Sequence, residues 1–475
     1  MNKTIKGHTY GTQFFLGGAM ISGFISAIIV WACTVEKYTW LILLPISFGV
    51  ISILFNGVYR LIGKSITVTL LIALMFLKNV IIPIFMALGD GFFAAHVDTA
   101  SKMLPAVLLE IYEELVVFIV LNWRLKRLGK SISNAYMGVF DVRKDKVKAF
   151  SLITFIILLI AIGCFVLYPQ LASYISIGVS GDTDKTIQQV RMQILMKETV
   201  PTLFYYTYTF AVNVLRWIVP AMVMFRLYLS HKRETTKIVL SFLVIGLSVI
   251  MMTDTVAVSV YIALAFSLLM CKMYPTQRKR ILTFSVLAVG IAGAALLFIK
   301  TFGSGEFKNT AIGEIAYMLQ AYFSGPENVA VALEINASPS VSETVGDILK
   351  FIPYMMYFFK ELPSSNIVFN QTYWGSTDIT TQIIPMISQG ARHFTVILAP
   401  IYTAIVTNIA IKWETKATNK NELLDYAVCA IGCVCFSMAV AMYNASLCIQ
   451  LYLNYVFPIQ LMVWFIKKIS VKGKL

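Results

Sequence analysis

The sequence predicts an all-α polytopic membrane protein of about 12 transmembrane helices, with a large extracytoplasmic helical loop between helices 9 and 10. The first observation is composition: 58% of the 475 residues are hydrophobic, 13% are charged and the mean hydropathy is +0.77. Soluble globular proteins do not have this balance. The second is a series of long apolar runs, and the third is one long polar interruption over residues 301–392.

The apolar runs predict the individual spans. A helix needs roughly 20 mostly apolar residues, at about 1.5 Å each, to cross about 30 Å of hydrocarbon. Twelve runs satisfy this: 14–33, 39–58, 66–88, 104–123, 149–168, 203–227, 238–255, 256–271, 281–298, 393–411, 425–443 and 449–466. The seventh and eighth have almost no loop between them, which fits a tight pair or a partly re-entrant segment.

The basic residues predict the orientation. With a cytoplasmic N-terminus, 27 of the 39 Lys and Arg residues fall in inside segments and 10 in outside segments, although the outside segments are longer. This is the positive-inside pattern of a plasma membrane protein. We therefore expect both termini in the cytoplasm and residues 301–392 outside. The net charge of +15 has the same origin, so we expect the lipid bilayer, and no nucleic acid, as a partner.

The polar interruption is predicted to be an ordered module. Apolar residues at spacings of three and four predict one helix over 312–323 and another over 345–359. Ser340 precedes Glu343 by three residues, which is the pattern of a capping box at the start of the second helix. The predicted order is thus spans one to nine in 1–300, the module in 301–392, and spans ten to twelve with a cytoplasmic tail in 393–475.

Ionisable residues inside predicted spans are costly and need a reason. Lys78 lies in the third span, and Glu110, Glu113 and Glu114 lie in the fourth. They form either a structural ion pair between neighbouring helices or a proton-carrying or catalytic carboxylate in a cavity. Arg216 in the sixth span either extends toward the interface or binds a phosphate or pyrophosphate through its planar guanidinium.

The module contributes further candidates. Arg392 and His393 re-enter the membrane, where a cation and a titratable imidazole suit a headgroup. The turns at Tyr322 to Gly325 and at Trp374 suit sugar stacking, or are simply packed turns. Glu327 and Asp378 follow these two turns and are reserve candidates. The sequence has no metal-ligand spacing and no phosphate-binding glycine loop, so we expect no metal and no cofactor.

Two segments carry a family resemblance. AYFSGPENVAVALE at 321–334, and STDITTQ at 376–382 followed by IIPMISQGARHFTVILAPIYT, resemble Wzy-type oligosaccharide repeat-unit polymerases of bacterial surface polysaccharides, including O-antigen, capsule and exopolysaccharide. Tyr322, Ser324 and Gly325 match the tyrosine, small residue and glycine of that family. Where spans seven and eight meet, the family often has a Ser-Arg element, whereas this chain reads MMTDTVAVS.

The resemblance implies a glycosyltransferase that transfers a growing glycan from undecaprenyl pyrophosphate onto a new lipid-linked repeat unit, at the outer face of the bacterial plasma membrane. Arginines would stabilise the departing pyrophosphate, and one base would deprotonate the acceptor hydroxyl. Arg216, Arg392 and Arg191 are the candidates for the pyrophosphate. His393 is the candidate base, with Glu327 or Asp378 as substitutes. A chain-length regulator and a flippase are the protein partners implied.

Two other functions fit the same topology. A transporter or flippase for lipid-linked oligosaccharide also needs many spans and intramembrane charges, although no paired halves are visible in the sequence. An outer-face ligase, which joins finished glycan to an acceptor lipid, is the alternative within the enzyme class.

Overall fold

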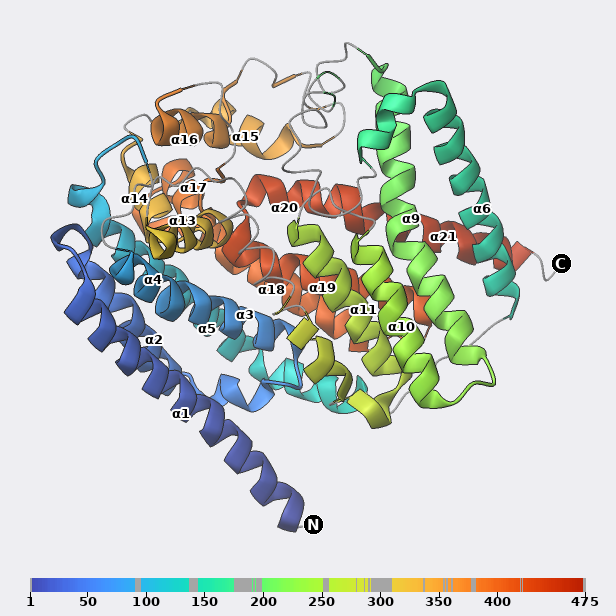
Figure 1. The fold of residues 1–475 in the computed structure, drawn as a ribbon, viewed down its shortest axis with the longest axis horizontal. Helices are drawn as coiled ribbons and strands as arrows, with labels where there is room; N and C mark the ends of the chain where they lie inside the picture. The colour runs from blue at the N-terminus through green and yellow to red at the C-terminus, as the bar shows by residue number, and fades with distance from the viewer. Residues whose placement is uncertain are drawn as a thin grey trace. The chain divides into compact units, whose positions relative to one another are not determined.

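The fold was analysed in a computed structural model of the whole chain, in which every regular element described is a helix (Figure 1). The structure describes residues 2–89, 95–135, 144–174, 190, 193, 199–250, 256–278, 280–285, 287–288, 291, 310–335, 338–352, 355, 358–359, 362–376, 382–418, 420 and 422–472.

Eight helical segments of the described residues are long and apolar enough to cross a membrane: Thr12–Cys33, Glu36–Leu54, Ile66–Leu88, Phe150–Leu167, Thr202–Leu229, Val396–Thr418, Leu424–Met442 and Ala445–Lys468. Each coincides with one of the predicted runs, so the class of polytopic helical membrane protein is confirmed. A count of twelve spans remains a prediction. The run at 104–123 lies inside a longer helix that carries three glutamates, and the run at 256–271 overlaps a shorter apolar helix, Val260–Met273.

The chain divides into two compact units, which are described separately. The first comprises residues 1–132, 297–415 and 435–450, and the second residues 133–296, 416–434 and 451–475. Helix α19 (Leu423–Met442) contributes to both. This division by contact differs from the three-part order along the sequence, because both units are assembled from distant segments.

The first unit contains the amino-terminal helices and the polar module. Its elements are α1 (Asn2–Cys33), η1 (Glu36–Ile42), α2 (Leu43–Leu54), η2 (Asn56–Leu61), α3 (Ile66–Phe76), η3 (Leu77–Ile81), α4 (Ile82–Leu88), η4 (Ala100–Lys102), most of α5 (Met103–Ala135), α13 (Ala311–Phe323), α14 (Pro326–Leu333), α15 (Val341–Leu349), α16 (Ser365–Trp374), α17 (Met386–His393), η8 (Val396–Leu398), most of α18 (Ile401–Thr418) and α20 (Ala445–Leu451).

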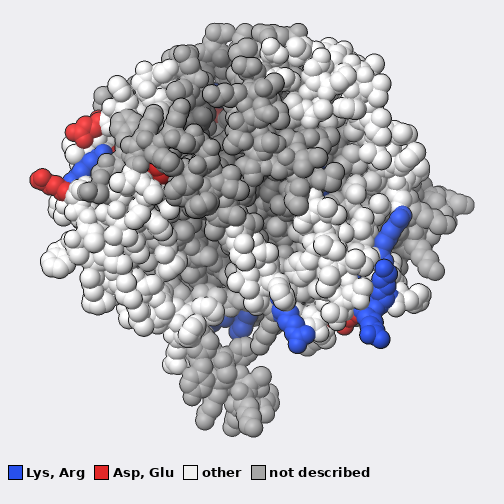
Figure 2. Space-filling model, viewed as in Figure 1, with Lys and Arg blue, Asp and Glu red and all other residues white. Residues whose placement is uncertain are grey.

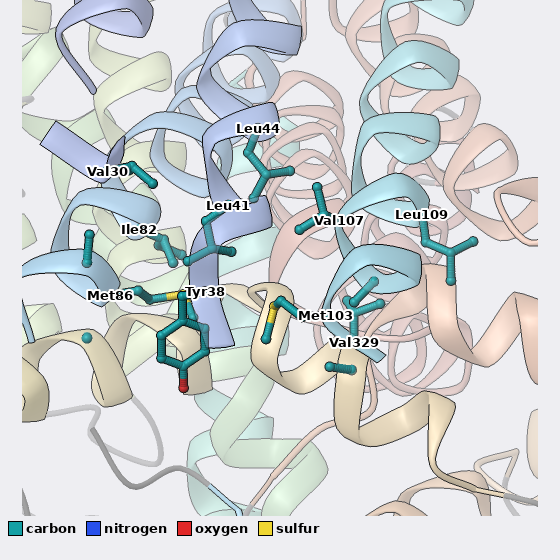
Figure 3. Close-up of a cluster of buried hydrophobic side chains, with 14 of the residues drawn as sticks. Val30, Tyr38, Leu41, Leu44, Ile82, Met86, Met103, Val107, Leu109 and Val329 are labelled. Carbon is teal, nitrogen blue, oxygen red and sulfur yellow. The ribbon is translucent and has the colours of Figure 1, made fainter. Parts of the chain in front are cut away.

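One apolar cluster joins the module to the amino-terminal helices. Tyr38, Met86 and Met103 are fully buried beside Val329 of α14 (Figure 3). Leu319 of α13 belongs to the same cluster. Helix α13 packs along α4, and α14 contacts α16 and α17 (Figure 1). The module is therefore built onto the ends of the apolar helices, and it shares their core instead of having only its own.

The two module helices test the sequence prediction directly. Helix α13 covers the predicted range and packs along α4. Helix α15 begins with the predicted capping box: Ser340 Oγ accepts from the Glu343 N–H, and the Glu343 carboxylate accepts from the Ser340 N–H. The predicted continuation to residue 359 is wrong, since α15 ends at Leu349. Pro353 follows shortly after in the sequence, and a proline disfavours the helical conformation at the residue before it.

The second unit is a bundle of apolar helices. It contains α6 (Lys144–Leu167), η5 (Pro169–Tyr174), α9 (Thr202–Leu229), α10 (Glu234–Ile250), α11 (Val256–Met273), η6 (Pro275–Gln277), η9 (Tyr452–Val456) and α21 (Phe457–Lys472). Helix α9 packs against α6, α10 and α21. The outer side of α6 is apolar, with Val166 68% exposed, as expected of a surface that faces lipid.

Candidate functional site

Glu327 lies at the amino terminus of α14, in the turn that the sequence singles out. Ser324 has a left-handed conformation (φ 49°) that ends α13, Gly325 is the N-cap of α14, and Pro326 occupies the first helical position. The Glu327 carboxylate thus lies in the first turn of α14, where free backbone N–H groups stabilise a negative charge. The local sequence therefore fixes the position of this side chain.

Two side chains from elsewhere in the first unit hold one oxygen of Glu327. Lys37 Nζ lies 3.1 Å from Oε1, and Thr99 Oγ1 donates to the same atom at 2.7 Å. Glu327 is 1% exposed, whereas the Lys37 side chain is 31% exposed and reaches the carboxylate from the surface. The other oxygen, Oε2, is buried, and the Tyr38 hydroxyl also interacts with this carboxylate. One oxygen is thus held by two side chains, and the whole carboxylate is enclosed by the protein.

The turn residues Tyr322 and Gly325 have different surroundings. Tyr322 is half-buried at the end of α13. A Cβ on Gly325 would lie 2.3 Å from the Gln320 side-chain oxygen, so a larger residue here would require the Gln320 side chain to move. The requirement for glycine is explained by packing within the turn, and a sugar contact is not needed to account for it.

Trp374 ends α16, which packs against α14. Gly375 follows it in the left-handed region (φ 67°), which favours glycine. The Trp374 and Tyr373 rings lie 4.8 Å apart at 59°. The indole Nε1 of Trp374 is buried without a partner among the described residues. Trp374 thus brings an aromatic ring and a buried indole N–H to the helix beside α14, and aromatic rings of this kind suit a sugar.

His393 is fully engaged. Its imidazole is 0% exposed; Nε2 lies 3.2 Å from Asp347 Oδ2 and 3.1 Å from Ser365 Oγ, and Nδ1 lies 2.9 Å from the Tyr402 hydroxyl. Gln389 Nε2 also donates to Asp347 Oδ2, at 2.8 Å. Both ring nitrogens therefore have partners inside the protein, and this arrangement joins α15, α16, α17 and α18 more directly than it presents a base to a substrate.

The charge of Asp347 is stabilised by this network. Burial raises the pKa of the Asp347 carboxyl, but hydrogen bonds from His393, Ser365 and Gln389 outweigh it, so that the pKa is lowered from its ordinary value of 3.8. Arg392, the neighbour of His393, is half-buried near Asp347 and Glu343. Burial lowers the pKa of its guanidinium, whereas the two carboxylates raise it. Arg392 thus lies in an acidic environment.

Arg216 lines a cavity in the second unit. It is 4% exposed on α9, and its Nη1 donates to Asn213 Oδ1 at 3.3 Å. The cavity has a volume of about 600 Å³ and is walled by apolar side chains of α6, α9 and α10, including Phe165, Val219 and Leu247. These three are also exposed on the outer surface, so the cavity opens where a bilayer would lie. The sequence alternative of an arginine that extends to the interface does not describe this buried side chain.

The intramembrane charges of the first unit form an ion pair, which is one of the two alternatives that the sequence left open. Lys78 Nζ lies 2.6 Å from Glu113 Oε2 and 3.3 Å from Glu110 Oε1, and all three side chains are at most 2% exposed. Thr403 Oγ1 donates to the other oxygen of Glu113 at 2.7 Å. The pair therefore connects η3, α5 and α18.

The structure gathers most but not all of the predicted site residues. Tyr322, Gly325, Glu327, Trp374, Arg392 and His393 lie on α13, α14, α16 and α17 of the first unit, whereas Arg216 belongs to the second. Arg191 and Asp378 lie outside the described residues. Sequence reasoning missed Lys37, Thr99 and Asp347. For Lys37, the sequence gives one indication: it is a lone lysine between two predicted spans, where a charged side chain can reach a buried acidic partner.

No protein-family model, curated protein or solved structure matches this chain. The residues that the structure describes include no cluster of three His, Cys, Asp or Glu side chains that could hold a metal ion.

Proposed function

We propose that this protein is a membrane glycosyltransferase that polymerises undecaprenyl-pyrophosphate-linked oligosaccharide repeat units into surface polysaccharide, at the outer face of a bacterial plasma membrane. The observation that carries the proposal is the Glu327 carboxylate. It is buried at the start of α14, within the segment that resembles Wzy-type polymerases, with one oxygen held by Lys37 and Thr99 and the Tyr38 hydroxyl beside the carboxylate.

In this proposal Glu327 is the general base. The acceptor hydroxyl attacks the anomeric carbon of the donor glycan, its proton passes to Glu327 Oε2, and the bond from that carbon to the pyrophosphate oxygen breaks. Glu327 is favoured over His393 for this role, because both imidazole nitrogens of His393 already have protein partners. Trp374 provides an aromatic ring for the sugar next to α14, and Lys37 is a cation in direct contact with Glu327.

Arg392 and Arg216 are proposed to bind pyrophosphate. Arg392 lies at the end of α17, close to the start of a candidate span at Val396. Arg216 lies in a cavity lined by apolar side chains, and a guanidinium in such surroundings favours a bidentate anion.

The orientation is proposed from the distribution of charge. In the second unit, Figure 2 shows basic side chains over the turn between α9 and α10. Arg226, His231, Lys232 and Arg233 are exposed at this turn. Such a cluster marks the cytoplasmic end of a helix pair. With twelve spans, the module then faces outward and both termini lie in the cytoplasm.

The test is the size distribution of surface and lipid-linked glycan in cells that lack the gene and carry a plasmid-borne copy. We expect single repeat units without the gene, a full ladder with the wild type, and single units with Glu327→Gln. Glu334→Gln, at the other end of α14, is the matched control and should restore the ladder. A full ladder with Glu327→Gln at normal protein abundance would exclude Glu327 as the base.

The same experiment separates the two alternatives. Finished polymer that stays on its lipid carrier in the deletion strain would identify a ligase. Repeat units that accumulate facing the cytoplasm would identify a flippase. One observation favours the flippase specifically: Lys78, Glu110 and Glu113 are buried together among the apolar helices, and intramembrane ionisable groups often serve transport.

A further inference from the structure

A second polar site lies where α3 passes into α4 through one π-helical turn, η3. Single π-helical turns occur mostly inside α-helices and frequently at functional sites. Here the turn carries two adjacent polar residues, Lys78 and Asn79, at 2% and 0% exposure. Both contact α5, which bears three glutamates: Lys78 contacts Glu110 and Glu113, and Asn79 contacts Glu114.

The charges of this site do not balance. Lys78 supplies one positive charge, whereas Glu110, Glu113 and Glu114 supply three negative charges when all are ionised. All four residues are at most 2% exposed. Glu113 is fully satisfied by Lys78 and Thr403. The excess negative charge therefore rests on Glu110 and Glu114, and an uncompensated buried charge costs several kcal/mol.

The contact between Asn79 and Glu114 indicates how the excess is reduced. Asn79 Nδ2 donates to Glu114 Oε2 at 3.0 Å, whereas Ser47 Oγ lies 3.4 Å from the same oxygen and donates to the Leu44 carbonyl at 2.7 Å. The remaining oxygens, Asn79 Oδ1 and Glu114 Oε1, are both buried and have no partner among the described residues. Both atoms are acceptors when Glu114 is ionised, so they cannot satisfy each other in that state.

We propose that Glu114 binds a proton on Oε1 and that this carboxylic acid donates to Asn79 Oδ1. With the existing bond from Asn79 Nδ2, the two side chains then form a two-bond acid–amide pair, in which every oxygen has a partner. The protein would thereby hold an exchangeable proton among its membrane helices. This site is separate from Glu327, and it does not depend on the glycosyltransferase proposal.

The charged groups around Glu114 determine how tightly it holds this proton. Lys78, Glu110 and Glu113 are the charged groups beside it, and Tyr59 of η2 lies close enough to interact electrostatically. Glu110 Oε2 is buried without a partner among the described residues, and residues 110 and 114 lie one helical turn apart. Glu110 is therefore the neighbour that can accept the proton from Glu114 when it leaves.

A contrasting acid in the same unit is buried but has a full set of hydrogen-bond donors. Glu414 is 6% exposed on α18, but it accepts from Ser65 Oγ at 2.6 Å and from the backbone N–H groups of Ile66 and Thr67 at 2.7 and 3.3 Å. These donors stabilise an ionised carboxylate at the amino terminus of α3. Glu414 is thus a matched control for Glu114.

The experiment is infrared difference spectroscopy of the purified full chain in detergent, between acidic and alkaline pH. We expect the wild type to retain a carboxylic-acid C=O band at neutral pH. Glu114→Gln should remove the intensity of one carboxyl, because the glutamine amide can make both hydrogen bonds to Asn79 without a proton. Glu414→Gln should leave this band unchanged, and Asn79→Leu should shift its frequency.

Several outcomes would overturn the proposal. One is an unchanged neutral-pH band in Glu114→Gln, and another is the absence of such a band in the wild type. Loss of the band when sodium replaces potassium at constant pH would assign the site to a metal cation instead. If Glu114→Gln does not accumulate, Asn79→Leu decides the question, because an unshifted band would show that the protonated carboxyl is not paired with Asn79.

Discussion

Asp347 Oδ2 lies 3.2 Å from His393 Nε2, and this contact joins α15 of the module to the last turn of α17. Asp347 also accepts from the Ser365 N–H at 3.0 Å and from Gln389 at 2.8 Å. Gln389 in turn donates to Ser446 Oγ at 2.8 Å and accepts from the Ala445 N–H at 2.9 Å. The Asp347 carboxylate is thereby connected, through Gln389, to the start of α20.

The acid stability of the protein should depend on Asp347. Its pKa is lowered in the folded state by His393, Ser365 and Gln389, so the unfolded state binds more protons and stability rises with pH. The stability that ionised Asp347 contributes is complete above 3.8, the ordinary pKa of an aspartate, and it is lost as the pH falls below that value. We expect Asp347→Asn to flatten the acid dependence of thermal unfolding in detergent between about pH 5 and pH 2. Parallel losses in wild type and variant would contradict this.

The anchoring of Glu327 should be measurable in chain elongation. Thr99→Val keeps the shape of the side chain but removes the donor at 2.7 Å from Glu327 Oε1. A hydrogen bond to a charged group contributes about 1.5–3 kcal/mol, so we expect elongation by purified protein in vesicles to slow on the order of 10- to 100-fold. Thr99→Ser, which restores the hydroxyl, should recover most of the rate. If Thr99→Val elongates at the wild-type rate, Thr99 does not position the base.

Removing Lys78 should destabilise the first unit strongly. Lys78→Met leaves Glu110 and Glu113 buried without their cation, and the loss of one partner of a buried pair costs about 3–5 kcal/mol. Arg60→Met, at an exposed position, is the control and should change stability by less than about 1 kcal/mol. Unfolding in detergent measures both. The double variant Lys78→Met, Glu113→Gln should lose less than the sum of its single variants.

Gly390 should not tolerate alanine. A Cβ at this position in α17 would lie 1.9 Å from the Ala399 carbonyl oxygen, so the backbone there would have to move. Overpacking of this kind typically costs about 1–3 kcal/mol. Gly49→Ala in α2 has open space around the new methyl group and should stabilise by up to about 1 kcal/mol. Equal unfolding temperatures for the two variants would show that α17 and residue 399 can separate at little cost.

The parts of the fold that could be predicted are those determined by nearby residues. The capping box of Ser340 and Glu343 depends on a spacing of three, and α13 depends on one apolar periodicity. The pair of Lys78 with Glu113 was predictable for a related reason, because a charge in an apolar helix needs a partner and few were available. The early end of α15 was missed because the apolar pattern continues past Leu349.

The site itself depends on residues that are far apart in the sequence. In the sequence, Glu327 has the pattern of a solvated acid after a turn. Its burial follows only from the packing of α14 onto Tyr38 and Met103. Asp347 likewise lies in a polar stretch that is typical of an exposed helix. No local pattern encodes its contact with His393, because the connecting chain includes α16 and the start of α17.

The contact between Lys37 and Glu327 has a consequence for the timing of folding. The two residues are 290 positions apart, and the ribosome adds about 5–20 residues per second. The interval between the synthesis of Lys37 and the synthesis of Glu327 is therefore on the order of 15 to 60 s. During that interval the surfaces that will bury Leu319 and Val329 remain uncovered. A newly made chain should thus be most vulnerable to membrane proteases before α14 has been synthesised, and nascent chains stalled shortly before and shortly after α14 should differ sharply in lifetime.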